Sequence, residues 1–108
     1  MSLPNSYRDI KLKYGNKVNE IKNLSQKDWM AICKKLGLYV APERGKGSHC
    51  AVLKDAVCKP EKSDCLVVTL PCNIYPNFQR DLVKKVIYYG AVSGMYTEED
   101  FWKIVDKI

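Results

Sequence analysis

His49 is the only histidine of this sequence and the residue best suited to acid–base chemistry. Histidine takes up and releases a proton near neutral pH. It directly follows the segment 44–48 (Arg-Gly-Lys-Gly-Ser), in which the glycines let the backbone approach a phosphate closely and Arg44 and Lys46 supply positive charge. Such a histidine can remove the proton from the 2′-OH of RNA while neighbouring cations neutralise the attacked phosphate. The alternative is a surface histidine at a strand start, because a lone histidine is weak evidence for catalysis.

The residues expected to contact nucleic acid cluster around this histidine. They are Arg44, Lys46, Gly47, Ser48 and Lys54. Neighbours on a strand point to opposite faces, so Ser48 is not expected to form a catalytic triad with the histidine. Its expected role is a hydrogen bond to phosphate or to the turn.

The cysteine pattern favours free thiols over a metal site. The five cysteines are residues 33, 50, 58, 65 and 72, and no Cys-x-x-Cys pair occurs. A scattered metal site that includes His49 is the less favoured alternative. No pair of carboxylates has metal-binding spacing, so neither a metal nor another cofactor is expected. Residues 1–5 lack the basic start and apolar centre of a signal peptide, and we expect reduced thiols in the cytoplasm.

Charge is distributed unevenly along the 108 residues, a length typical of one domain. The first 60 residues carry twelve basic and five acidic groups, whereas residues 61–108 carry six basic and seven acidic groups. A basic front half favours a polyanionic partner such as nucleic acid. No apolar run approaches the roughly 20 residues that a membrane span needs, so no membrane partner is expected.

Hydrophobic periodicity predicts the elements that must position His49. A helix is expected over 26–36, begun by a capping box at Ser25 and Asp28, and a second helix is expected to begin at Asn77 as N-cap and to end at Gly90 or Gly94. A short last helix should follow Thr97. Between the first two helices, strands are expected over 38–41, 49–53 and 65–70, with a loop over 54–64.

These elements predict an α+β domain in which helices pack on one face of a small three-stranded antiparallel sheet. Residues 1–23 are expected to be an N-terminal extension and residues 24–108 the domain. Trp29 and Trp102 are expected in the interior, and Tyr88-Tyr89 beside Lys84-Lys85 on a solvated helix face, with RNA contact as the less favoured alternative. The expected core residues are Trp29, Ile32, Leu36, Val52, Val67, Leu82 and Val86.

Over about residues 25–106 the sequence resembles the HicA toxins. The matching segments are Leu36-Gly37-Leu38-Tyr39-Val40, Gly47-Ser48-His49, Val67-Val68-Thr69-Leu70-Pro71 and the closing Thr97-Glu98-Glu99-Asp100-Phe101. The resemblance implies a fold like the double-stranded-RNA-binding domain, α-β-β-β-α, here with a short C-terminal helix. It also implies the toxin of a toxin–antitoxin system, an endoribonuclease that cleaves mRNA with His49 as catalytic residue. A HicB-like antitoxin protein would cover the site.

The chain departs from the HicA pattern at three places. The loop over 54–64 is longer than the usual hairpin, the stretch 90–97 is lengthened, and no second histidine follows Pro71. Two other functions stay open. One is a non-catalytic RNA-binding module on the same fold, and the other is a protein-interaction domain whose charge serves solubility.

Overall fold

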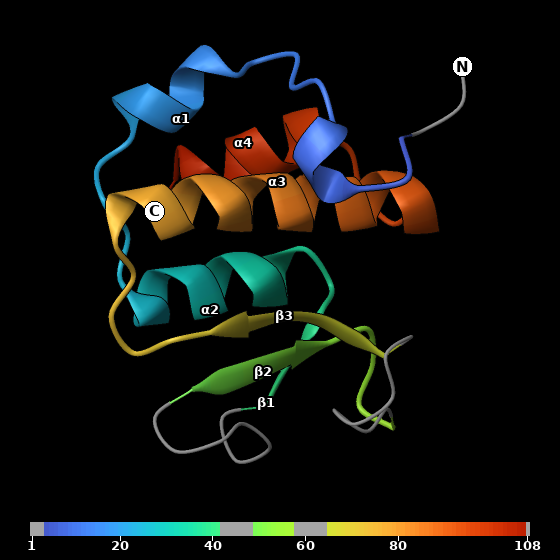
Figure 1. Ribbon diagram of the computed structural model, residues 1–108. Helices are drawn as coiled ribbons and strands as arrows, with labels where there is room; N and C mark the ends of the chain where they lie inside the picture. Colours follow the sequence, from blue (N-terminus) through green and yellow to red (C-terminus); the bar gives the residue numbers. More distant parts are fainter. Residues whose placement is uncertain (1–3, 42–48, 58–64, 108) are drawn as a thin grey trace.

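The computed structural model describes residues 4–41, 49–57 and 65–107, and it confirms an α+β fold (Figure 1). Helices precede a three-stranded antiparallel sheet, and a long and a short helix follow it. In chain order the elements are η1 (Tyr7–Asp9), α1 (Asn16–Glu20), α2 (Gln26–Lys35), β1 (Tyr39–Ala41), β2 (Cys50–Leu53), β3 (Leu66–Leu70), α3 (Pro76–Ser93) and α4 (Glu98–Val105). Within the described ranges, no helix is both long and apolar enough to cross a membrane.

The predicted start of α2 is confirmed. The Ser25 side chain accepts a hydrogen bond from the backbone N–H of Asp28, and the Asp28 carboxylate accepts one from the backbone N–H of Ser25. This capping box satisfies two donors that a helix start leaves without a partner. The helix ends before Gly37, whose φ of 92° lies in the left-handed region that glycine adopts most readily.

The sheet is a meander in the order β1-β2-β3, and all its neighbours are antiparallel. The pairing Val40↔Val52↔Val68 sets the register of the face that packs against the helices. Alternate residues form a second, smaller cluster on the other face. Its members are Ala41, Ala51, Leu53 and Cys65, with Tyr39 packed against them.

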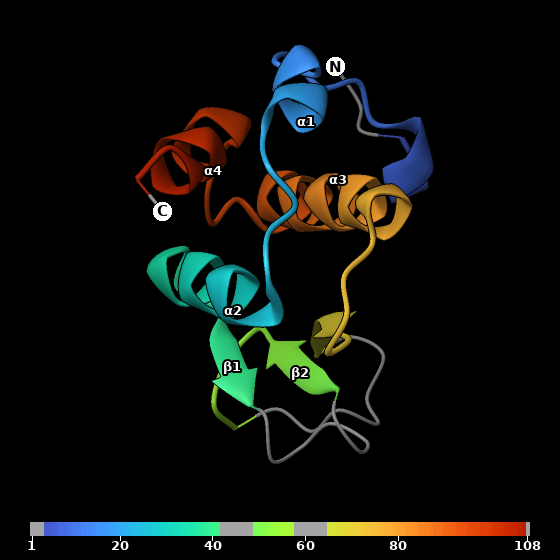
Figure 2. The ribbon, with the colours of Figure 1, turned by 90° about the vertical axis from the view of Figure 1, so that its left-hand side faces the viewer.

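The main core lies between the sheet and the helices, which all lie on one side of it (Figure 2). The aromatic rings of Trp29 and Phe101 lie 5.9 Å apart, and Trp102 packs edge-on against Phe101. Both tryptophans are buried as expected, and so are all but one of the seven expected core residues. Val67 is the exception, because Val68 and Leu70 take the inward positions of β3 and leave Val67 half-buried.

The expected N-cap of α3 at Asn77 is wrong. The cap is Tyr75, and Pro76 occupies the first helical position, where its missing N–H costs nothing. The helix runs on to Gly94, whose φ is 75°, so the second of the two predicted ends is correct. Gly90 lies inside the helix against Tyr96, and a Cβ added there would come within 2.3 Å of that ring.

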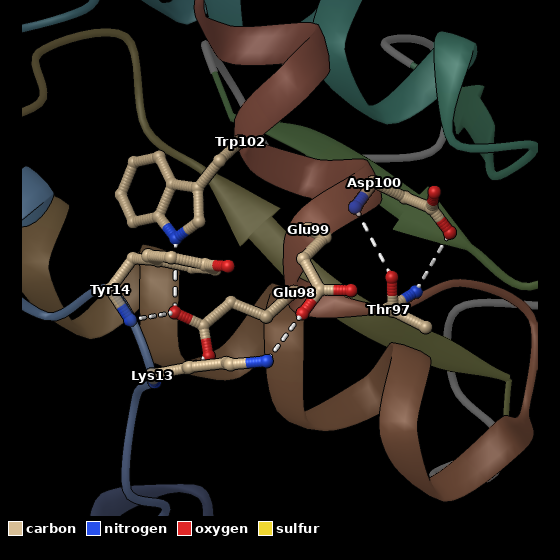
Figure 3. A network of polar contacts seen from close by, with 7 residues as sticks. All are labelled: Lys13, Tyr14, Thr97, Glu98, Glu99, Asp100 and Trp102. Atoms are coloured by element: carbon tan, nitrogen blue, oxygen red, sulfur yellow. Dashed lines mark hydrogen bonds and ion pairs between the residues drawn. The ribbon is translucent and has the colours of Figure 1, made fainter.

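Residues 4–23 pack against the same core as the rest of the chain. Ile10, Leu12, Val18 and Ile21 all contact it. Figure 3 shows the polar contacts that hold this segment to α4. The carboxylate of Glu98 accepts hydrogen bonds from the backbone N–H groups of Lys13 and Tyr14, both at 2.7 Å, and from Nε1 of Trp102 at 3.1 Å.

A buried glutamine joins the N-terminal segment to α3. Gln79 is 4% exposed, and its Oε1 accepts hydrogen bonds from the backbone N–H of Leu24 at 2.7 Å and from Nε1 of Trp29 at 3.4 Å. Its Nε2 donates to the carbonyl oxygen of Lys22 at 3.2 Å. The side chain therefore satisfies three polar groups of other residues, and two of these hydrogen bonds are buried.

One of the described cysteines contradicts the expectation that all the thiols are free. Cys33, Cys50 and Cys72 are free, but Cys65 is disulfide-bonded. The expectation rested on the missing signal-peptide pattern and the missing Cys-x-x-Cys pair, and sequence spacing says nothing of cysteines that folding brings within bonding distance. The prediction of free thiols is therefore wrong for Cys65.

Candidate nucleic-acid interface

His49 is exposed and lies directly before β2, whereas the sequence predicts it as the first residue of a strand over 49–53. Since Cys50 pairs with Leu70 in the antiparallel register, His49 lies opposite Pro71, at the end of β3. It thus stands at an end of the sheet, where a long polymeric ligand can reach it.

His49 is part of the lining of a groove between α3 and β3. The groove has a volume of about 520 Å³ and is open to solvent. Its floor is β3, from Leu66 to Thr69, with Pro71 beyond. In both Figure 1 and Figure 2, α3 runs along the sheet on the β3 side, and the chain reverses direction between the two elements.

Aromatic and aliphatic side chains make the other wall of this α3–β3 groove. From α3 come one phenylalanine, two tyrosines, a lysine and a valine, and η1 adds a further tyrosine; they are Phe78, Tyr88, Tyr89, Lys85, Val92 and Tyr7. The rings are partly exposed rather than sealed in the core. The wall therefore offers flat apolar surfaces to a ligand.

The charge at the groove is positive. Of the described residues that line it, none is a carboxylate, and Lys85 carries the only side chain that is always cationic at neutral pH. The Lys85 Nζ atom lies 5.2 Å from the centroid of the Tyr7 ring. The guanidinium of Arg8 lies 5.5 Å from the same centroid, and its Nε donates a hydrogen bond to the Tyr7 hydroxyl at 3.3 Å. Two cations thus accompany this ring at the groove.

Two groove tyrosines interact with neighbouring groups through a hydrogen bond or through electrostatics. The Tyr88 hydroxyl donates a hydrogen bond to the carbonyl oxygen of Pro4 at 2.5 Å, which holds the η1 segment against α3. Burial, and to a lesser degree the carboxylate of Asp55, raise the pKa of Tyr89. This tyrosine therefore stays protonated and keeps a hydroxyl donor over the whole physiological range.

The structure separates two of the predicted site residues. Lys54 is exposed at the opposite end of β2 from His49. Five residues of strand correspond to about 17 Å, so one phosphate cannot touch both side chains. Arg44, Lys46, Gly47 and Ser48 lie outside the described residues.

Several groove residues were not predicted as a site. Tyr88, Tyr89 and Lys85 were expected on a solvated face, but they line the groove and are half-buried. Two tyrosines close to a lysine in the sequence are a signal by which a nucleic-acid contact could have been predicted. Tyr7 and Phe78 carried none, because only tertiary packing brings η1 and the start of α3 to the same wall.

No cation site is visible in the described part of the chain. Among residues 4–41, 49–57 and 65–107, no three His, Cys, Asp or Glu side chains are grouped so that they could hold a metal ion. The chemistry available at the groove is that of an exposed imidazole, an ammonium group, tyrosine hydroxyls and aromatic faces.

Comparison with known proteins gave no match. No protein family, no curated protein and no solved structure matches this chain. The class that fold and site define is therefore a small α+β domain with an exposed histidine at an aromatic, positively charged groove.

Proposed function

We propose that this protein is a metal-independent endoribonuclease of the HicA type, the toxin of a toxin–antitoxin pair, with His49 as its catalytic residue. The observation that carries the proposal is the position of His49, exposed at the end of the sheet and lining a groove with aromatic and cationic walls. The order α2-β1-β2-β3-α3 agrees with the double-stranded-RNA-binding-like fold that the sequence resemblance implies. The net charge of +6 agrees with a polyanionic substrate.

In the proposed reaction His49 removes the proton of a ribose 2′-OH. The freed oxygen attacks the adjacent phosphorus, the bond from phosphorus to the 5′ oxygen breaks, and that oxygen takes up a proton from water, while the protonated His49 returns its proton to the solvent. The products are a 2′,3′-cyclic phosphate and a 5′ hydroxyl. In this proposal positive charge from Lys85, Arg44 and Lys46 stabilises the negative charge that develops on the phosphate oxygens.

The proposed partners are mRNA and a HicB-like antitoxin that covers the groove. The RNA substrate assigns the activity to the cytoplasm. Disulfides are rare in reducing compartments, so the disulfide of Cys65 is the feature that agrees least with this location. Assays are therefore run both with and without a reductant.

A non-catalytic RNA-binding module is the second candidate. It is favoured by the aromatic wall of the groove, because stacking and charge can bind RNA without any proton transfer. The two candidates differ in whether His49 is needed after the RNA is bound.

Induced expression in a bacterial host separates the two candidates in the cell. We expect the wild type to arrest growth and His49→Ala to leave growth unaffected at equal protein level, because the exposed imidazole can be removed without disturbing the core. Tyr75→Ala, which removes a 68% exposed ring outside the groove, is the control and should arrest growth like the wild type. Growth arrest by His49→Ala would contradict the catalytic role.

A further inference from the structure

We propose that the α3–β3 groove is a base-binding site for single-stranded RNA, in which one base stacks among the rings of Tyr7, Phe78 and Tyr88. For the chemical identity of its ligand this inference rests on the proposed function. It adds which form of RNA is recognised and by which residues.

The first argument is the shape and lining of the groove. Its volume of about 520 Å³ lies in the range of roughly 300–1,000 Å³ that is usual for sites that hold small molecules. Two elements bring aromatic rings to it: η1, and α3 near its start and in its second half. The faces of bases stack on such rings with little dependence on sequence.

The positive charge beside the groove suits the phosphate that accompanies a bound base. A base that enters the groove brings its phosphate to the rim, where the ligand needs positive charge and no carboxylate. Lys85 and Arg8 both lie at the Tyr7 ring, and none of the described lining residues is acidic. Two carboxylates outside the lining, Asp55 and Asp81, are near enough to act electrostatically on a groove tyrosine and on Arg8. A phosphate placed beside this ring is therefore within reach of two cations.

The third argument distinguishes single strands from duplexes. In an A-form duplex the bases are stacked on one another, and proteins contact mainly phosphates and 2′-hydroxyls. Unpaired bases can be splayed out and stacked on aromatic side chains. Since the walls of the groove are largely ring and aliphatic carbon, they suit the second kind of ligand.

An extended peptide is the competing occupant. In the order β1-β2-β3, one edge of β3 has no strand beside it among the described residues, and a peptide strand could be added there. Such a peptide would use the backbone of β3 and the exposed side chains of Leu66 and Val92. It would make no particular use of aromatic rings beside two cations, so we favour the nucleotide.

The test measures binding without cleavage. The probe is a labelled 12-nucleotide 2′-O-methyl RNA that contains the fluorescent base 2-aminopurine. Because the methylated riboses have no free 2′-hydroxyl, this RNA cannot be cleaved. Affinity is followed by fluorescence anisotropy for the single strand and for the same strand annealed to its complement. Quenching of 2-aminopurine reports stacking directly. We expect the single strand to bind at least five-fold more tightly than the duplex and its fluorescence to be quenched.

Substitutions at Tyr88 separate the ring from its hydroxyl. Tyr88→Phe keeps the stacking ring and loses the hydrogen bond to Pro4, so it should bind more tightly, and with more quenching, than Tyr88→Leu. Tyr88→Leu keeps an apolar side chain and loses the stacking surface, so it should bind about 5–150-fold more weakly and with less quenching. Tyr75→Leu, at an exposed tyrosine outside the groove, is the matched control and should bind like the wild type.

Two lysine variants, one at the groove and one outside it, test whether the groove binds a phosphate. Lys85→Gln should weaken binding and lower the slope of log affinity against log salt by about one. Lys103→Gln, on the exposed side of α4 and outside the groove, should lower the slope by less. If Lys85→Gln and Lys103→Gln had the same slope of log affinity against log salt, the assignment of the phosphate to Lys85 would be contradicted.

The outcomes for the site and for the activity are separable. Unchanged binding and quenching by Tyr88→Leu, or a preference for duplex, would overturn the base-binding site even if the wild type cleaves unmodified RNA. Conversely, the expected binding results without any cleavage of unmodified RNA would support the site and refute the endoribonuclease. A wild type that binds neither probe would overturn the site and favour a protein occupant.

Discussion

At the scale of single residues, Gln79 is the most consequential polar side chain of the core. It partners three polar groups of Lys22, Leu24 and Trp29. Gln79→Leu leaves the N–H groups of Leu24 and Trp29 without partners in a buried environment, and we expect a loss of about 2–4 kcal/mol in the free energy of unfolding. Urea denaturation measures the loss. Asn77→Leu, at an exposed position of the same helix, is the control, and equal stability of the two variants would contradict this account.

Gly90 leaves room for the ring of Tyr96, which a side chain at this position would meet. Alanine normally favours a helix over glycine by about 1 kcal/mol. Here the added methyl group would meet the ring of Tyr96, whose hydroxyl donates a hydrogen bond to the carbonyl oxygen of Val86 at 2.6 Å and so cannot retreat freely. We therefore expect Gly90→Ala to lower stability by about 1–3 kcal/mol, measured by thermal unfolding. A gain in stability would show that the ring moves away at no cost.

At the scale of elements, the contacts of α4 fix the N-terminal segment. Glu98 accepts two backbone N–H groups of that segment, whereas Glu99 makes only an exposed ion pair with Lys13 at 3.1 Å. Exposed pairs contribute about 0–1 kcal/mol, so Glu99→Ala should be almost neutral. Glu98→Ala should cost about 1–3 kcal/mol and should speed hydrogen exchange of the amides at residues 13 and 14. Similar exchange in the two variants would contradict this role of Glu98.

The elements themselves could largely be predicted from the sequence, because their signals are local. The capping boxes at Ser25 and Thr97 and the apolar spacing of α2 define helices without any tertiary information. The start of α3 was misjudged because Asn77 is a good cap in isolation, whereas Pro76 already fits the first turn. The groove could not be predicted, since it arises where η1, α3 and β3 meet.

At the scale of the whole molecule, buried acids set the response to alkali. Burial in the core, with a smaller contribution from nearby Cys50, raises the pKa of Cys33 from its usual value to about 12. Burial also raises the pKa of Tyr96. Above pH 9 the unfolded chain can lose the Cys33 proton while the folded chain keeps it, so stability must fall as pH rises from about 9 to 12.

We expect Cys33 to contribute up to about 1.4 kcal/mol per pH unit to this fall. Chemical denaturation at several pH values measures the slope. Cys33→Ala should reduce the slope, whatever the cavity does to the stability itself, whereas Cys72→Ala, at an exposed thiol, should leave it unchanged. Identical slopes in all three proteins would contradict the role of the buried thiol.

The most direct test of the central claim is the cleavage of unmodified single-stranded RNA by the purified protein in EDTA. The account predicts that the wild type produces fragments ending in a 2′,3′-cyclic phosphate or a 3′-phosphate. It also predicts that His49→Ala and His49→Gln yield none while they bind the RNA within a few-fold of the wild type, because a single side chain adds little to an interface that many charges dominate. Cleavage by either variant at the rate of the wild type would contradict the assignment of His49.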